Sequence, residues 1–144
     1  MITIKEAISK KEITEYIKFP FSLYKNNKYW VPPLIADELE AFDKLKNPVF
    51  KNAEAYYYLA YKNNKIVGRI TSIINWEEVN HQQKKKVRFG WFDVIDDIEV
   101  TKALLEKVYE ACMAHVLSKD GLYIQRQVDI PIVFDGLIFD EGLR

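Results

Sequence analysis

The chain has 144 residues, of which 49% are hydrophobic and 29% charged, and its 21 Lys and Arg residues balance 21 Asp and Glu. This length and composition are those of one globular domain over residues 1–144, and they exclude a disordered or fibrous protein. Because the net charge is zero, nothing in the composition supports a nucleic-acid or membrane-surface role, and we expect neither partner.

Cysteine and histidine usage narrows the chemistry further. Cys112 is the single cysteine, which excludes an internal disulfide and a zinc site built on paired thiolates. His81 and His115 lack the spacing of metal ligands, so we predict no metal. The N-terminus has no apolar signal region and no window approaches roughly 18 uninterrupted apolar residues, so we expect a cytoplasmic protein.

The N-terminal third predicts a strand and two helices. Residues 2–7 read as a short strand, and Ser9 with Glu12 fits a capping box that opens a helix ended or kinked by Pro20. A second helix carries apolar residues at helical spacing, namely Ile35, Leu39 and Phe42. Between the helices, Trp30 with its prolines forms either an exposed recognition ridge or a clamp over the sheet. We favour the clamp, because large aromatics seldom stay exposed.

A hairpin and a central strand come next. Two β-branched and aromatic runs flank the turn at residues 62–65, where asparagines tolerate the positive φ of a tight turn. Residues 87–95 read as a further strand, and its two apolar sides predict a central position. Alternation places Val87, Phe89, Trp91, Asp93 and Ile95 on one side and Arg88, Gly90, Phe92 and Val94 on the other.

The last part of the chain predicts a long helix and further strands. Asp96 and Glu99 fit a second capping box, ahead of an apolar stripe made of Val100, Leu104, Val108 and Cys112. Residues 122–128 are strand-like, and a hairpin-like turn at Asp135 and Gly136 follows.

This order of elements is similar to that of the GCN5-related N-acetyltransferase (GNAT) superfamily. The segment YKNNKYWVPPL at residues 24–34 and the run IVGRI after the turn resemble a bacterial branch of GNAT-like proteins of unassigned substrate. The resemblance covers residues 2–128 and implies an α/β (α+β) fold with a mixed, mainly antiparallel sheet flanked by helices. It also implies acetyl-CoA as cofactor and an amine, on a small molecule or a peptide, as substrate.

The resemblance also implies where a cofactor would bind. Strand amides would polarise the thioester carbonyl, and the turn before the long helix would approach the pyrophosphate, since helix N-termini bind anions. The residues in these positions are Phe92, Val94, Ile95, Asp96, Asp97 and Ile98. Asp93 on the same strand would be the base that removes a proton from the amine, and Glu77 and Glu78 are alternative bases. The alternative for Asp93 is a structural role at a strand end, which we favour.

Other side chains have a functional and a structural interpretation. Tyr58 and Trp91 would line the amine site, because aromatic faces attract cations, although strands favour tyrosine in any case. The lysines at positions 84–86, with Arg88, would meet a phosphate or form a soluble surface. The position of Cys112 on the apolar stripe predicts that its thiol is buried and inert.

The sequence departs from the GNAT pattern in two places. The cofactor turn reads VIDDIEV, where the family carries glycines and a cation, so its carboxylates would cap the helix and repel a diphosphate. Few residues follow position 128, so the fold looks incomplete at its C-terminus. Two functions remain open: an acyl-CoA-dependent N-acyltransferase, and a non-catalytic GNAT-like module that pairs with another protein or with itself as a homodimer.

Overall fold

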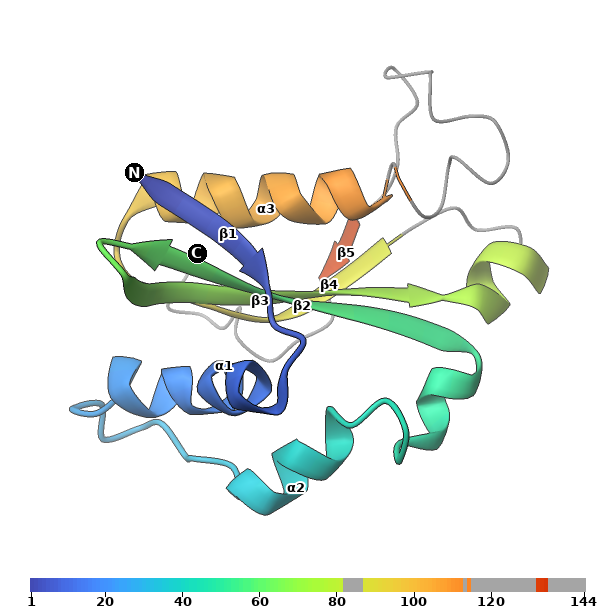
Figure 1. Cartoon of the computed structure of the whole chain (residues 1–144), viewed down its shortest axis with the longest axis horizontal. Helices are drawn as coiled ribbons and strands as arrows, with labels where there is room; N and C mark the ends of the chain where they lie inside the picture. The colour runs from blue at the N-terminus through green and yellow to red at the C-terminus, as the bar shows by residue number, and fades with distance from the viewer. Residues whose placement is uncertain (82–86, 113, 115–131, 135–144) are drawn as a thin grey trace.

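The structure, a computed structural model, describes residues 1–81, 87–112, 114 and 132–134, and the statements below concern these residues (Figure 1). They form strands, α-helices and two short helical turns. In chain order these are β1 (Ile2–Glu6), α1 (Lys10–Leu23), α2 (Ile35–Ala41), the 3-10 helix η1 (Pro48–Lys51), β2 (Ala53–Lys62), β3 (Lys65–Asn75), the π-helical turn η2 (Glu77–His81), β4 (Val87–Val94), α3 (Ile98–Cys112) and β5 (Ile132–Phe134).

The strands form one sheet in the order β1-β2-β3-β4-β5. The first four strands pair antiparallel, and β5 pairs parallel with β4. Helix α3 covers one face of this sheet, and α1 and α2 lie on the other (Figure 1). The prediction of a mixed, mainly antiparallel sheet flanked by helices is therefore confirmed. The predictions for residues 122–128, for the Asp135-Gly136 turn and for an incomplete C-terminus lie outside the described residues.

Each face of the sheet has its own apolar core. The predicted stripe of α3 is confirmed at Val100, Leu104 and Val108, which are fully buried against β3 and β4. On the opposite face, Tyr16 of α1 packs with Tyr57 of β2 and with Phe42 at the end of α2. Burying one such aliphatic side chain contributes about 1.5–3 kcal/mol, so the two layers hold the sheet between them.

Helix α1 begins at the predicted capping box. The Glu12 N–H donates to the Ser9 hydroxyl over 3.1 Å, and the Glu12 carboxylate accepts from the Ser9 N–H over 3.0 Å. Pro20 was predicted to end or kink the helix; it does not end it, since α1 continues to Leu23 with Pro20 inside. A proline there leaves the carbonyl four residues earlier, that of Tyr16, without its helical donor, and another residue has to satisfy it.

The hairpin between β2 and β3 is confirmed in register and in turn chemistry. Lys62 pairs with Lys65, and the two asparagines between them have φ of 53° at Asn63 and 62° at Asn64. Both values lie in the left-handed region that a two-residue turn requires and that asparagine adopts at low cost.

The predicted alternation along β4 is wrong from Trp91 to Val94. Arg69 of β3 faces Asp93, but Thr71 faces Gly90, so β4 holds one residue more than β3 over this interval. The extra residue is Trp91, whose φ is 49°. This β-bulge exchanges the two sides of the strand. Val87 and Phe89 therefore lie on the α3 face with Phe92 and Val94, whereas Trp91 packs on the α1 and α2 face.

Gly68 allows α3 to lie close to β3. A Cβ atom at this position would lie 2.9 Å from Leu104 Cδ1, 3.1 Å from Val100 Cγ1 and 3.2 Å from Val94 Cγ2. Only a residue without a side chain leaves room for the first two turns of α3, so Gly68 fixes the distance between helix and sheet at the end nearest the predicted cofactor turn.

Candidate functional site

Within the described residues, the pairing between β4 and β5 ends before the part of β4 where the cofactor was predicted. β4 pairs with β3 as far as Val94, but its pairing with β5 covers only Val87, Arg88 and Phe89. Beyond Phe89, no strand within the described residues pairs with the β5 side of β4. A strand edge without a paired strand can bind an extended ligand.

The backbone N–H groups at the end of β4 point in two directions, toward β3 and away from it. The Ile95 N–H donates to the Val67 carbonyl over 3.0 Å, so it points toward β3. Successive residues of a strand direct their N–H groups to opposite sides, so the Val94 N–H points to the unpaired edge. Of the two amides predicted to polarise a carbonyl, that of Val94 thus points away from β3, whereas that of Ile95 already has a partner. Phe92 contributes its ring to the core beside Phe89, with ring centres 6.1 Å apart.

The N-terminus of α3 is capped one residue later than predicted. Asp97 Oδ1 accepts from the Glu99 N–H over 3.0 Å, and the Asp97 carbonyl accepts from the Val100 and Thr101 N–H groups. Asp97 is therefore the capping residue, and Val100, not Glu99, stands at the third helical position. The predicted capping box between Asp96 and Glu99 is wrong, because two adjacent aspartates precede the helix and the second one supplies the cap.

Asp97 also bridges the hairpin to α3. Its Oδ2 accepts from Lys62 Nζ over 2.9 Å, and this hydrogen bond, with that from the Glu99 amide, lowers the pKa of Asp97 below its usual value. A charged carboxylate thus occupies part of the helix end where a diphosphate would bind. Asp96 and Ile98 flank it and are exposed.

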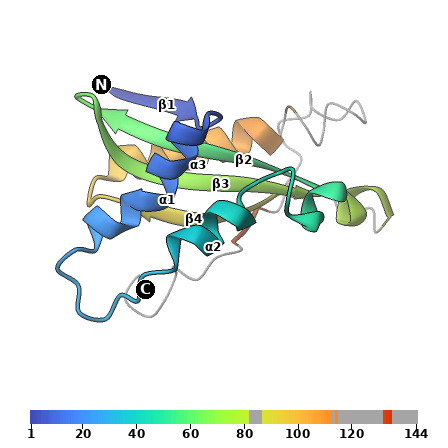
Figure 2. The same cartoon turned by 60° about the horizontal axis from the view of Figure 1, so that its bottom comes forward.

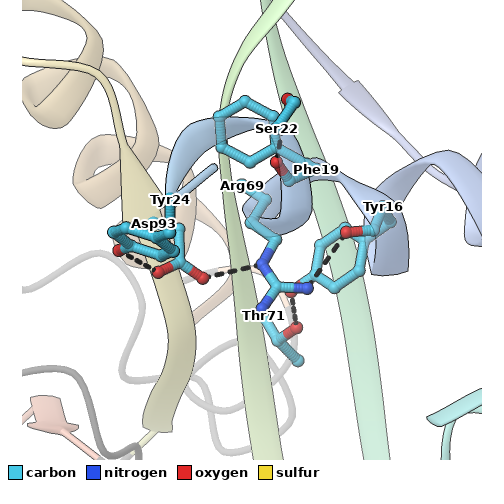
Figure 3. A network of polar contacts seen from close by, with 7 residues as sticks. All are labelled: Tyr16, Phe19, Ser22, Tyr24, Arg69, Thr71 and Asp93. Atoms are coloured by element: carbon cyan, nitrogen blue, oxygen red, sulfur yellow. Dashed lines mark hydrogen bonds and ion pairs between the residues drawn. The ribbon is translucent and has the colours of Figure 1, made fainter. Parts of the chain in front are cut away.

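Asp93 lies in a buried polar network between β4, β3 and α1 (Figure 3). Asp93 Oδ2 accepts from Arg69 Nε over 2.9 Å, and Oδ1 accepts from the Tyr24 hydroxyl over 2.5 Å. The side chains of Arg69 and Asp93 are only 7% and 4% exposed. Both oxygens of the predicted base are therefore engaged, and its nearest route to a substrate is through the hydroxyl of Tyr24, which is half-buried.

Arg69 satisfies the carbonyl that Pro20 leaves without a helical donor. Its Nη1 donates to the Tyr16 carbonyl over 3.0 Å, and its guanidinium carbon lies 4.9 Å from the centre of the Tyr16 ring. The Tyr16 hydroxyl makes a hydrogen bond with the Thr71 hydroxyl on the same strand as Arg69 (Figure 3). Burial raises the pKa of Tyr16 far above its usual range, so this hydroxyl stays protonated.

Arg69 was missed by the sequence interpretation. It stands in the run IVGRI, which the sequence analysis used only for the resemblance to GNAT-like proteins. Two signals together would have indicated it: a proline inside a helix, which leaves one carbonyl without a donor, and an arginine within an otherwise apolar strand.

Tyr58 and Trp91 do not line one substrate site, because they lie on opposite faces of the sheet. Tyr58 is buried in the α3 core, where Lys107 Nζ lies 5.7 Å from its ring centre. Trp91, turned over by the bulge, packs on Phe42 with ring centres 5.4 Å apart. Burial raises the pKa of Tyr58 to about 12, as expected for a core phenol.

Some of the remaining candidate residues lie within the part of the chain that the structure describes, and others lie outside it. Residues 84–86 and His115 lie outside the described part of the chain, and α3 reaches Cys112. Glu77, one of the alternative bases, is exposed. Within the described residues, no group of three or more His, Cys, Asp or Glu side chains is placed to hold a metal ion. No described helix combines the length and apolarity needed to cross a membrane.

Comparison with solved structures shows a GNAT-like fold. A tandem GNAT protein from the clavulanic acid biosynthesis pathway matches with a TM-score of 0.60 and 11% identity, over 81% of this chain and 34% of that one. A putative acetyl transferase from Pyrococcus furiosus matches with a TM-score of 0.56 and 16% identity, over 99% of this chain and 87% of that one. An acetyltransferase from Streptococcus agalactiae 2603 matches with a TM-score of 0.50 and 12% identity, over 93% and 92%. At these identities the similarity concerns the fold.

Sequence comparison gives a different picture. Protein YghO of Escherichia coli K12 is 34% identical over 101 residues, which are 70% of this chain and 26% of that protein. A bacterial ceramide synthase of Caulobacter vibrioides is 31% identical over 64 residues, 44% of this chain and 17% of that one. The chain thus spans about a quarter or less of these relatives. The PD-(D/E)XK nuclease superfamily matches at residues 81–144, less than half of the chain, and this match does not assign a family.

Proposed function

We propose that the chain belongs to an enzyme that transfers an acyl group from a coenzyme A thioester, such as acetyl-CoA, to an amine. The observation that carries this proposal is the edge of β4, which after Phe89 has no strand partner among the described residues of a GNAT-like sheet and leads toward α3. A fold of this kind supports a class of reaction and not a particular acyl donor or amine.

The β4 edge can bind the acyl group of such a donor. The N-terminus of α3 is less suited to bind the diphosphate. The Val94 N–H would donate to the thioester carbonyl, where negative charge develops when an amine attacks. At α3, Asp97 already accepts the Glu99 N–H, so a diphosphate would bind there only beside or in place of this carboxylate. When bound, the thioester supplies an activated acyl group, and the chain supplies its orientation and a proton acceptor.

The proton acceptor would act through the network around Asp93. An amine must lose a proton to attack and to complete the amide. Tyr24 donates to Asp93 in this structure, so a proton from the amine would reach Asp93 through the Tyr24 hydroxyl, with Arg69 balancing the charge. A base role for Asp93 stays a prediction. The relative named a ceramide synthase supports an amine acceptor, because a ceramide is an amide.

Cofactor binding is tested by a pair of variants at the turn. Asp97→Asn keeps an oxygen that can cap α3, since asparagine caps as well as aspartate, but removes the negative charge. We expect isothermal titration calorimetry to show acetyl-CoA binding that tightens roughly five- to tenfold in Asp97→Asn. The matched control is Asp96→Asn, which removes the same charge from the exposed neighbour and should change affinity less.

Unchanged affinity in both variants would place the diphosphate elsewhere. Absence of acetyl-CoA binding at millimolar concentration in both would contradict the proposal for this chain and favour the second candidate, a non-catalytic GNAT-like module that acts through protein or homodimer contacts. The observation in favour of that candidate is that Asp97 and Asp93 both already have partners within the chain.

A further inference from the structure

The connection between α1 and α2 presents an unusual group of exposed apolar side chains. We call residues 25–34 the tip loop. Tyr29, Val31 and Leu34 are 81%, 83% and 71% exposed, and Pro32 and Pro33 between them are exposed as well. Figure 2 shows this connection extending away from the two helices. Contiguous apolar exposure of this kind usually marks a contact surface.

Trp30 holds the tip loop in this arrangement. Its ring packs edge-on against Phe21 at 5.2 Å between centres and lies 5.5 Å from the ring of Tyr24, both near the end of α1. The predicted clamp is thus the role of Trp30, although it clamps the loop to α1 and not to the sheet. Because Trp30 faces inward, its neighbours Tyr29 and Val31 are directed outward.

Few of the backbone N–H groups at residues 29–34 need a hydrogen bond from water. The Tyr29 N–H donates to Asn27 Oδ1 over 2.9 Å, and the Trp30 N–H donates to the Asn27 carbonyl over 3.4 Å. Pro32 and Pro33 have no N–H to satisfy. Four of the six residues at 29–34 therefore present no unbonded N–H group. The N–H groups of this segment therefore add little to the cost of its transfer into a less polar medium.

The charged residues of the tip loop itself are both lysines, and the first acidic residues, Asp37 and Glu38, follow in α2. Residues 24–34 contain Lys25 and Lys28 and no acidic residue, although the whole chain is neutral. Lys28 Nζ lies 5.1 Å from the centre of the Tyr29 ring, at the border between the cationic and the apolar parts. Lysines beside an aromatic and aliphatic tip match an anionic lipid surface, where the ammonium groups meet headgroups and the rings lie at the interface.

We propose that the tip loop docks this chain on the surface of an anionic lipid bilayer, with Tyr29, Val31 and Leu34 entering the interface and Lys25 and Lys28 contacting headgroups. A projecting loop favours a bilayer over a protein partner, because a fluid interface needs no complementary pocket. The overall composition gave no sign of this surface, since it averages the charges and apolar residues of the whole chain. The inference does not depend on acyl transfer.

Vesicle co-sedimentation tests the proposal with the 144-residue chain. We expect the chain to sediment with phosphatidylcholine vesicles that contain phosphatidylglycerol and much less with phosphatidylcholine alone. Val31→Asp with Leu34→Asp should lower the partition coefficient roughly tenfold or more. Lys25→Gln and Lys28→Gln should each lower it about fivefold, and added salt should do the same.

The matched control places two aspartates on exposed apolar residues elsewhere. Leu45 and Val49 are 98% and 56% exposed and lie outside the tip loop. Leu45→Asp with Val49→Asp should leave vesicle binding unchanged, and thermal melts should show that both double variants remain folded. Lack of binding by the wild-type chain, or equal loss in control and tip variants, would overturn the proposal. Binding to neutral vesicles that ignores the tip substitutions would overturn it as well.

Discussion

Arg69 of β3 contacts two other elements at once, β4 and α1. Its guanidinium pairs with Asp93 of β4, donates to the Tyr16 carbonyl of α1 and lies against the Tyr16 ring. A buried ion pair is weak evidence for stability when compared with an apolar pair, but loss of one partner leaves an uncompensated charge in the interior. The size of this penalty makes the pair a sensitive probe of the network.

Arg69→Met is expected to lower the free energy of unfolding by about 3–5 kcal/mol. Asp93 would stay buried without its ion-pair partner, and the Tyr16 carbonyl would lose its hydrogen-bond donor. Urea denaturation measures this change. Adding Asp93→Leu should recover a large part of it, since the second substitution removes the unpaired charge. As a control, Lys62→Met breaks the more exposed pair with Asp97 and should cost far less. Similar losses in Arg69→Met and Lys62→Met would show that the network is not energetically special.

Among the elements, α3 and β3 show how one small residue sets a packing distance. A methyl group at Gly68 would meet Leu104 and Val100 at distances shorter than nearly all real Cβ contacts. Gly68→Ala should therefore destabilise the protein by about 1–3 kcal/mol, although alanine usually favours a strand over glycine. The melting temperature and the urea midpoint measure this loss.

A compensating change makes the Gly68 prediction specific. Leu104→Ala removes the nearest methyl group, so Gly68→Ala should cost less in a Leu104→Ala background than in the wild type. Equal costs in the two backgrounds would mean that the helix shifts as a body, and that Gly68 does not set the distance.

The sequence predicted those elements whose signals are local. The Ser9 capping box, the Asn63-Asn64 turn and the stripe of α3 each depend on residues within a few positions of one another, and the structure contains all three. The bulge at Trp91 could not be predicted, because a single added residue reverses the faces of a strand whose two sides are both apolar. The Arg69–Asp93 pair joins residues 24 positions apart and depends on strand register, which local patterns do not fix.

At the scale of the whole molecule, the acid sensitivity of folding is tied to Glu12. Its carboxylate caps α1 and pairs with Lys5 of β1 over 2.9 Å, so it joins the first strand to the first helix. The hydrogen bond from the Ser9 amide, with those from Lys5 and Ile8, lowers the pKa of Glu12 from 4.5 to about 2. A lowered pKa means that the charged form stabilises the fold.

The stabilisation from Glu12 is fully present above about pH 4.5, the value for the unfolded chain, and is lost as the pH falls toward about 2. Glu12→Gln should therefore flatten the dependence of the unfolding free energy on pH in this window. Urea denaturation at several pH values measures the slope. Glu40→Gln, at an exposed glutamate of α2, is the control and should leave the slope nearly unchanged. The same slope in wild type and Glu12→Gln would assign the acid sensitivity to other carboxylates.

Because Pro20 and Arg69 both act on the Tyr16 carbonyl, substitutions at the two positions should be linked among relatives. Pro20 leaves the Tyr16 carbonyl without a helical donor, and Arg69 supplies one from a different element. A relative with an amide-bearing residue at position 20 would bond that carbonyl within its own helix and would need no arginine opposite. We therefore expect positions 20 and 69 to co-vary among relatives, with position 93 following position 69, and an alignment of many such chains would reveal this triplet without any structure.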